Sequence, residues 1–246
     1  MEFKTSISKI TEDDMILRGE KHSDLINTLS FSDTIFLLLT SKKPEKTESN
    51  IFSAILTSCI DHGMGTTSSL TARTVMSGGN NLNTAVGAGI LALGKYHGGA
   101  IEGCMNQLIE IKNKNVPTKE YVKQMLDNKK TILGFGHKVY KKQDPRVVQL
   151  LEIAKKNNIT SENNHHVKTV LEIEQAIEEI KGKKLILNVD GLIAALLLEM
   201  NFTPEQGNGV FIIARTPGLT AQAIEEKQRE KPVRRINEED IVYDGK

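Results

Sequence analysis

The chain has 246 residues, which is long enough to form one large domain or two modest ones. Its 32 basic and 31 acidic residues nearly cancel, and only 4% of its residues are aromatic, with no tryptophan among them. A nucleic-acid-binding surface needs a basic field and, for single strands, aromatic side chains on which bases stack. The composition therefore argues against a nucleic-acid partner.

The sequence also argues against a membrane or secreted protein. Its longest apolar runs, 35–39 and 192–198, are far shorter than the roughly 20 residues of a membrane-spanning helix. Residues 1–14 lack the apolar run of a signal peptide. Cys59 and Cys104 lie in apolar, helix-like stretches without metal-ligand spacing, which predicts reduced core residues. We therefore expect a cytoplasmic protein.

Helical periodicity dominates the chain after a short N-terminal stretch of alternation. Alternating residues around 3–7 and 15–17 predict a β-hairpin. Apolar residues spaced i, i+3 and i+4 then predict a series of helices, the first capped by Ser32 and the last two separated by Pro217. We place these helices at 32–39, 48–60, 68–76, 82–93, 100–111, from 117 onward, at 145–156, 167–180, 190–200, 204–214 and up to about 229. The charged tail from 231 is expected to be mostly irregular, so the fold class is all-α.

The loop 134–146 combines two glycines, His137, several lysines and Arg146. Asp144 and Pro145 have the residue types of an N-cap and a first helical position. Arg146 then lies in the first turn of a helix, where backbone N–H groups and the helix dipole already favour an anion. The loop therefore predicts a site for an anionic substrate.

Three further polar clusters, 61–63, 96–99 and 188–190, interrupt helical sequence. Each histidine taken alone is more often a turn residue or a capped core residue than a catalytic one. Together, histidines and an aspartate without a serine or cysteine nucleophile suggest proton transfer at carbon or at a carbonyl oxygen. Cys104 is disfavoured as a nucleophile because its stretch is typical of a buried helix, and His165 and His166 lack metal-ligand spacing.

Four motifs resemble the citrate synthase superfamily in order and spacing, from about residue 3 onward. They are GFGHKVYKKQDPR, YHGGAIEGCM, NVDGL and IARTPGLTAQAIEEK. The resemblance implies that His97 hydrogen-bonds the thioester oxygen of acetyl-CoA and that His137 contacts the oxaloacetate carbonyl or the citryl hydroxyl. It also implies that Asp190 exchanges a proton with the acetyl methyl carbon.

The resemblance implies a substrate-binding set as well. His62, Arg146 and Arg215 match dicarboxylate-binding positions, and Arg235 matches an arginine that reaches in from a neighbouring subunit, with Arg234 as the alternative register. The exposed-looking lysines of the loop are candidates for binding the phosphates of CoA; they are Lys138, Lys141 and Lys142. The coenzyme A thioester would be a substrate, and no metal or redox cofactor is implied.

The fold implied is a citrate synthase-like, two-domain helical fold with a short N-terminal β-hairpin. Residues 1–98 and 201–246 would form a large discontinuous domain and 99–200 a small one. The expected assembly is a homodimer or a larger homo-oligomer with a shared active site.

The departures from the family favour one of its branches. The chain is shorter than typical citrate synthases and lacks their N-terminal helical region, and NVDGLIAALLLEM lacks the aromatic residue and the serine-glycine usual in synthases. DHGMGTTSS and the RRINEEDIVYDGK tail are closer to citryl-CoA lyase and to the lyase module of ATP-citrate lyase.

We therefore predict cleavage of citryl-CoA to acetyl-CoA and oxaloacetate, with a separate citryl-CoA synthetase as a candidate partner. The alternatives are a small citrate or 2-methylcitrate synthase and a non-catalytic CoA-binding paralogue. The sequence leaves the physiological direction open.

Overall fold

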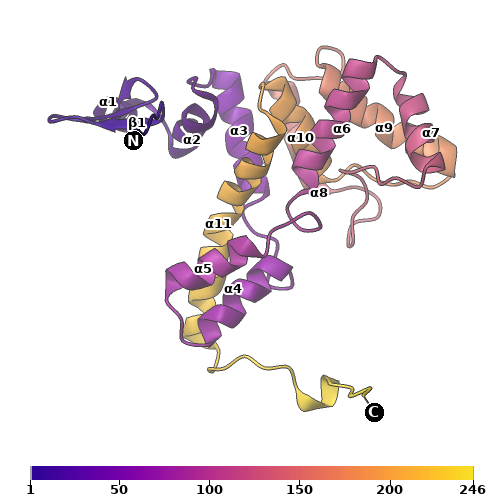
Figure 1. The fold of residues 1–246 in the computed structure, drawn as a ribbon. Helices are drawn as coiled ribbons and strands as arrows, with labels where there is room; N and C mark the ends of the chain where they lie inside the picture. The colour runs from indigo at the N-terminus through magenta and orange to yellow at the C-terminus, as the bar shows by residue number, and fades with distance from the viewer. Residues whose placement is uncertain (1, 246) are drawn as a thin grey trace. The chain divides into compact units, whose positions relative to one another are not determined.

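The computed structural model describes residues 2–245, which form eleven α-helices and one three-stranded sheet (Figure 1). The predicted all-α class and its short N-terminal sheet are confirmed. Backbone contacts divide the chain into two compact, discontinuous units. The first unit is Met1–Ser58 with Ala100–Phe211, and the second is Cys59–Gly99 with Ile212–Lys246. Domains that move as rigid bodies need not coincide with contact units, so the division at residues 99 and 200 stays a prediction.

The N-terminal sheet is antiparallel, in the order β1 (Ser8–Ile10), β2 (Met15–Leu17) and β3 (Glu20–Lys21). The predicted first strand at 3–7 was wrong in position. A turn closes where the Thr11 N–H donates to the Asp14 carbonyl at 2.8 Å, so the residues directly before Thr11 pair with β2. All of β1 is exposed, so it has no alternating apolar face for the sequence to reveal. The short helix α1 (His22–Thr28), which the sequence did not predict, follows directly.

The helix α2 (Phe31–Thr40) begins after Ser30, not at Ser32 as predicted. The reason is a capping box: the Asp33 N–H donates to Ser30 Oγ at 3.1 Å, and the Ser30 N–H donates to Asp33 Oδ2 at 3.4 Å. This exchange needs the acid three residues after the cap, a spacing that Ser32 lacks. On its buried face α2 packs against α3 (Lys46–Ser58) through Phe36 and Phe52, whose ring centroids are 5.3 Å apart.

The rest of the first unit packs around α10 (Val189–Glu199), whose residues 191–197 are all buried. The helix has apolar side chains on all of its faces, which is typical of a helix at the centre of a core. Its packing partners include α6 (Ala100–Lys114), α8 (Pro145–Lys156) and α9 (His165–Lys181), and α9 packs in turn against α7 (Thr118–Asp127).

The predicted break at Pro217 was wrong, because α11 (Pro204–Arg229) runs through it as one helix. Proline removes one helical N–H donor and crowds the preceding turn. Hydroxyls around it make additional bonds to the helix: Thr216 Oγ1 donates to the Ile212 carbonyl at 2.8 Å. Gly218 also lets α11 lie directly on the Ile60 backbone, where any Cβ would collide with the Ile60 carbonyl. Tertiary packing thus holds a helix that local propensity would interrupt.

The second unit contains α4 (Thr67–Ser77) and α5 (Leu82–Leu91), packed together as the small residues of α5 predict. A Cβ on Gly89 would lie 3.1 Å from Ala72 Cβ, so the glycine allows this close approach. Of the described residues after α11, up to 245, only η1 (Glu238–Asp240), a 3-10 turn, is regular, in agreement with the predicted irregular tail. Within residues 2–245 no helix has both the length and the apolar character needed to cross a membrane.

The loop at residues 134–136 lies backbone to backbone on the start of α10. The Asn188 N–H donates to the Gly134 carbonyl at 3.0 Å, and Asn188 Nδ2 donates to the Gly136 carbonyl at 2.9 Å. Asn188 also caps α10, since its Oδ1 accepts from the Gly191 N–H at 3.2 Å. Gly134 has φ +86°, which favours glycine, and a Cβ on Gly191 would lie 2.5 Å from the Gly134 oxygen. The loop and the first turn of α10 therefore form one rigid piece.

We expect Gly191→Ala to destabilise the protein by ~1–3 kcal/mol, because the added methyl must push the loop off the helix. Urea unfolding followed by circular dichroism measures the change. The matched control is Gly209→Ala in α11, where a Cβ would meet no atom within 4 Å. Replacing a helical glycine there should be neutral or stabilise by up to ~1 kcal/mol. Equal stabilities for the two variants would contradict the close packing.

Candidate functional site

In the first unit, His137 and Arg146 lie side by side at the start of α8. His137 Nδ1 accepts from the backbone N–H groups of Val139 and Tyr140, both at 3.0 Å, and its Nε2 lies 3.2 Å from Arg146 Nη2. All three neighbours are N–H donors, whereas a neutral imidazole has only one lone pair. An oxygen ligand near Nε2 and the guanidinium would relieve this crowding. His137 and Arg146, which the sequence places in one loop, are thus in contact in the structure, and their binding of an anion stays a prediction.

Asp144 has a larger role than the N-cap that the sequence predicts. It is fully buried, and its Oδ1 accepts from the backbone N–H and Nε of Arg146, both at 3.0 Å. Its Oδ2 accepts from Arg146 Nη2 at 2.8 Å and from the Val189 N–H of α10 at 3.1 Å. These bonds hold the pKa of Asp144 below its usual value although burial alone would raise it. One carboxylate therefore orients Arg146 and ties α8 to the start of α10.

Asp190 lies in the first turn of α10 and is half-buried. Its negative charge acts on Cys104, a fully buried free thiol of α6. Burial, and secondly the charge of Asp190, raise the pKa of Cys104 to about 12. The thiol is therefore protonated near neutral pH, which argues against a nucleophilic role. This agrees with the sequence analysis, which disfavours Cys104 as a nucleophile. Cys59 is likewise a free, buried thiol.

The three candidate lysines have different surroundings. Lys141 Nζ donates to the carbonyls of His137 at 3.1 Å and Lys138 at 3.0 Å, so it supports the loop that holds His137. Lys138 and Lys142 are exposed. Binding of CoA phosphates by any of the three stays a prediction.

In the second unit, His97 is held in a tight turn against the start of α4. The His97 N–H donates to the Gly94 carbonyl at 2.9 Å, and the Gly94 N–H donates to the His97 carbonyl at 2.7 Å. His97 Nε2 accepts from the Ser68 N–H at 3.3 Å and lies 2.8 Å from Ser68 Oγ. A backbone N–H can only donate, so Nε2 has the lone pair and Nδ1 the proton. The turn therefore presents His97 as an Nδ1–H donor. Ser68 was missed, although a run of hydroxyl residues at a helix start was the available signal.

Arg215 and His62 belong to the same neighbourhood. Burial, followed by the charges of Arg215 and then His62, lowers the pKa of His97 below its usual value. Arg215 is buried, at 3% exposure, and its Nε donates to the Cys59 carbonyl at 2.9 Å, while His62 is exposed. The structure thus gathers three of the predicted residues in the second unit, and His137, Arg146 and Asp190 in the first.

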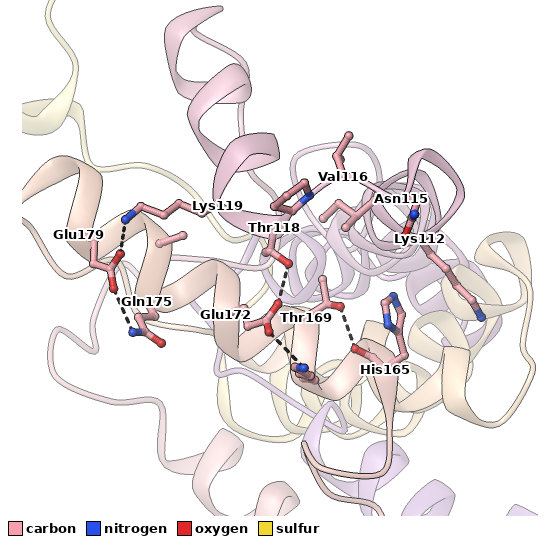
Figure 2. Close-up of a pocket in the computed structure, with 14 residues that line it drawn as sticks. Lys112, Asn115, Val116, Thr118, Lys119, His165, Thr169, Glu172, Gln175 and Glu179 are labelled. Carbon is pink, nitrogen blue, oxygen red and sulfur yellow. Dashed lines mark hydrogen bonds and ion pairs between the residues drawn. The ribbon is translucent and has the colours of Figure 1, made fainter.

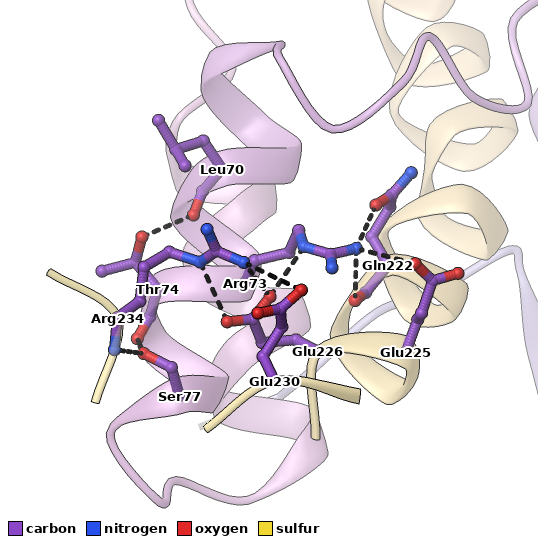
Figure 3. A network of polar contacts seen from close by, with 9 residues as sticks. All are labelled: Leu70, Arg73, Thr74, Ser77, Gln222, Glu225, Glu226, Glu230 and Arg234. Atoms are coloured by element: carbon purple, nitrogen blue, oxygen red, sulfur yellow. Dashed lines mark hydrogen bonds and ion pairs between the residues drawn. The ribbon is translucent and has the colours of Figure 1, made fainter. Parts of the chain in front are cut away.

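The two tail arginines differ sharply. Arg234 Nε and Nη2 donate to the carboxylate of Glu226 at 2.9 and 2.7 Å, a bidentate pair within the chain, and Figure 3 shows the two side chains facing each other. Arg235 is exposed. Neither arginine's predicted role toward a neighbouring subunit is tested by this geometry.

A separate hollow of about 450 Å³ lies between the end of α6, the start of α7 and α9 (Figure 2). None of the predicted catalytic residues lines it. Its two carboxylates are already engaged, since Glu172 accepts from Thr118 Oγ1 at 2.6 Å and Glu179 pairs with Lys119 at 2.7 Å. Among residues 2–245, no group of three or more His, Cys, Asp or Glu side chains is placed to hold a metal ion.

Comparison with known proteins identifies the family to which the chain belongs. The family model for the citrate synthase C-terminal domain matches residues 24–236. The chain therefore belongs to the citrate synthase family. The structure of citryl-CoA lyase from Hydrogenobacter thermophilus is 42% identical with a TM-score of 0.94, covering 99% of this chain and 95% of that one.

Two further relatives are larger proteins. The ATP citrate lyase from Methanothrix soehngenii, solved with citrate and coenzyme A, is 25% identical with a TM-score of 0.89 over 99% of this chain and 42% of that one. The citrate synthase of Synechocystis sp. is 31% identical over 210 residues, which are 84% of this chain and 52% of that synthase. The chain thus spans about half the length of the curated citrate synthase that it matches.

Proposed function

We propose that the protein is a citryl-CoA lyase. The observation that carries the proposal is the match to the Hydrogenobacter lyase, which extends over nearly the full length of both chains, whereas the Synechocystis synthase is matched over about half of its length. His97, His137 and Asp190, the three residues that the chemistry requires, are all present. We propose that the residue sets of the two units act on the same substrate molecule.

Cleavage breaks the C–C bond between the carbinol carbon and the thioester methylene of citryl-CoA. In our proposal the hydroxyl proton passes to His137 as the carbonyl of oxaloacetate forms. Nε2, the ring nitrogen beside Arg146 Nη2, would receive this proton, and it can do so only once Nδ1 no longer accepts from the backbone N–H groups of Val139 and Tyr140. The bond's electron pair moves toward the thioester, whose oxygen accepts from His97 Nδ1–H. Asp190, which must enter this step protonated, then gives its proton to the methylene carbon to form acetyl-CoA, and the proton held by His137 returns to the Asp190 carboxylate through solvent after the products leave.

The electrostatics suit this division of roles. A preorganised donor at a developing oxyanion is typically worth ~2.7–4 kcal/mol, and the Ser68 contacts fix the donor tautomer of His97 in advance. Arginine forks match carboxylates in a bidentate manner, so we assign the carboxylates of the substrate to Arg146, Arg215 and Arg235, with His62 beside them. Arg235 would come from a second copy in a homodimer or larger homo-oligomer. The loop lysines remain our candidates for the CoA phosphates.

The pH dependence follows from the two histidines, both of which act in the neutral form. Burial is the largest cause that lowers the pKa of each ring. The charge of Arg215 lowers the pKa of His97 further. At His137 the charge of Asp144 raises the pKa, and the charge of Arg146 lowers it. A lowered pKa places the midpoint of protonation below about 6.5, the unperturbed value. We expect kcat/KM to fall in acidic buffer, with the midpoint of the fall below about pH 6.5. An acidic limb with a midpoint above 6.5 would contradict the assignment.

The test is incubation of the purified protein with citryl-CoA, with oxaloacetate detected by coupled reduction. Release of oxaloacetate and acetyl-CoA supports the lyase, and the protein should need no added metal or redox cofactor. Hydrolysis to citrate and free CoA, without oxaloacetate, would favour a synthase. A lyase of this kind would receive its substrate from a citryl-CoA synthetase, which we propose as a separate partner in the cytoplasm.

A second candidate is a small citrate or 2-methylcitrate synthase, favoured by the curated citrate synthases that the chain matches, including a Bacillus subtilis citrate/2-methylcitrate synthase at 32% identity. Condensation of acetyl-CoA with oxaloacetate, or of propionyl-CoA with oxaloacetate, measured beside cleavage, separates the two. A protein that binds CoA but performs neither reaction would be a non-catalytic paralogue.

A further inference from the structure

Glu226 joins two arginines from distant parts of the second unit. Its side chain is fully buried, Arg73 Nε of α4 donates to Oε2 at 2.8 Å, and Arg234 of the tail binds both carboxylate oxygens. Figure 3 shows both guanidinium groups converging on Glu226. The backbone N–H of Arg234 also donates to Ser77 Oγ at 3.1 Å, so the tail is fixed at this residue by its main chain and its side chain.

The rest of the Arg73 guanidinium has its own partners. Its Nη1 donates to Gln222 Oε1 at 2.7 Å and lies 3.6 Å from Glu225 Oε1. Arg73 and Glu226 therefore form a neutral buried pair without the tail, and Arg234 is an addition to it. Glu226 is already neutralised by Arg73, so the fold does not require a second arginine at this carboxylate. The contact of Arg234 with Glu226 therefore needs a separate explanation.

The residue after this anchor is Arg235, which is exposed. We propose that Arg73, Glu226 and Arg234 form a positioning latch that sets where Arg235 leaves the second unit, so that it reaches the carboxylates of the substrate. Arg234 acts through Arg235 and touches no substrate. This inference rests on the proposed function, because it takes Arg235 to be a substrate-binding arginine.

The test is a double-mutant cycle on citryl-CoA cleavage, using the full-length protein. Arg235→Ala removes a charged hydrogen bond, which corresponds to a loss in kcat/KM of about 10- to 100-fold. We expect Arg234→Ala to produce the same loss with a raised KM, and the double variant to be no worse than Arg235→Ala alone. Arg234→Lys, which keeps one contact to Glu226, should recover part of the activity. Lys231→Ala, an exposed tail cation outside the latch, should behave as wild type.

Thermal unfolding of each variant is recorded in parallel, and we expect little change because Arg73 still neutralises Glu226. Losses that multiply in the double variant would overturn the latch, as would full activity of Arg234→Ala or of Arg235→Ala. If the wild type does not cleave citryl-CoA but condenses acetyl-CoA with oxaloacetate, the lyase assignment fails. The same cycle, run on condensation, then decides the latch independently.

Discussion

Asp190→Asn should lower kcat for citryl-CoA cleavage by about 10²- to 10⁴-fold, the usual contribution of a positioned acid or base. The amide keeps the size of the carboxyl group but neither donates nor accepts a proton at carbon. Asp190 lies in the first turn of α10, whose cap is supplied by Asn188 and not by Asp190 itself, so the helix should form normally.

A second measurement isolates the proton transfer. In heavy water the wild type should incorporate deuterium into the methyl group of acetyl-CoA when oxaloacetate is present, and Asp190→Asn should not. Asp127→Asn, an exposed aspartate at the end of α7, is the matched control and should keep full activity. Activity of Asp190→Asn within tenfold of wild type would remove the proposed mechanism, whether the physiological reaction is cleavage or condensation.

The sequence predicted local features well where a single segment contains both partners. The cap at Asp144 and the place of Pro145 at the first position of α8 depend on residues a few positions apart. The candidate-site residues His62, His97 and His137 could be predicted for a related reason, because each lies in a polar break between periodic helices, whereas Arg215 lies inside α11. The breaks were visible in the sequence, and the resemblance supplied the roles.

Features that depend on distant partners could not be predicted. Arg73 occurs in the polar-looking stretch Thr71–Thr74, yet it is buried because Glu226 lies beside it, 153 residues later in the sequence. Ser68 controls His97 across 29 residues, and the Val189 N–H reaches Asp144 across 45. Pro217 is accommodated by contacts of α11 with Ile60, which no local pattern contains. Residues that would take part in the reaction are therefore easier to find from the sequence than residues that orient them.

Asp144 is such an orienting group, and Asp144→Asn should be among the most harmful substitutions in the protein. The carboxylate accepts from two N–H donors at each oxygen, so an amide in either orientation points its own N–H₂ at two donors. Breaking a buried ion pair costs ~3–5 kcal/mol, and we expect the lower end because the Arg146 side chain is 23% exposed. Arg146 should also lose its orientation, which raises KM for citryl-CoA.

The pH dependence of this loss identifies its cause. The pKa of Asp144 is lowered in the folded state, chiefly because hydrogen bonds from Arg146 outweigh the opposing effect of burial. Its stabilising contribution is therefore complete above about 3.9, the unfolded value, and disappears as the pH falls through the folded pKa. The difference in unfolding free energy between wild type and Asp144→Asn, from urea titrations, should be constant from pH 7 to 5 and shrink below pH 4. A steric effect of the substitution would be independent of pH, so a difference that persists unchanged in acid would show that the charge of Asp144 is not what holds Arg146 and α10 together.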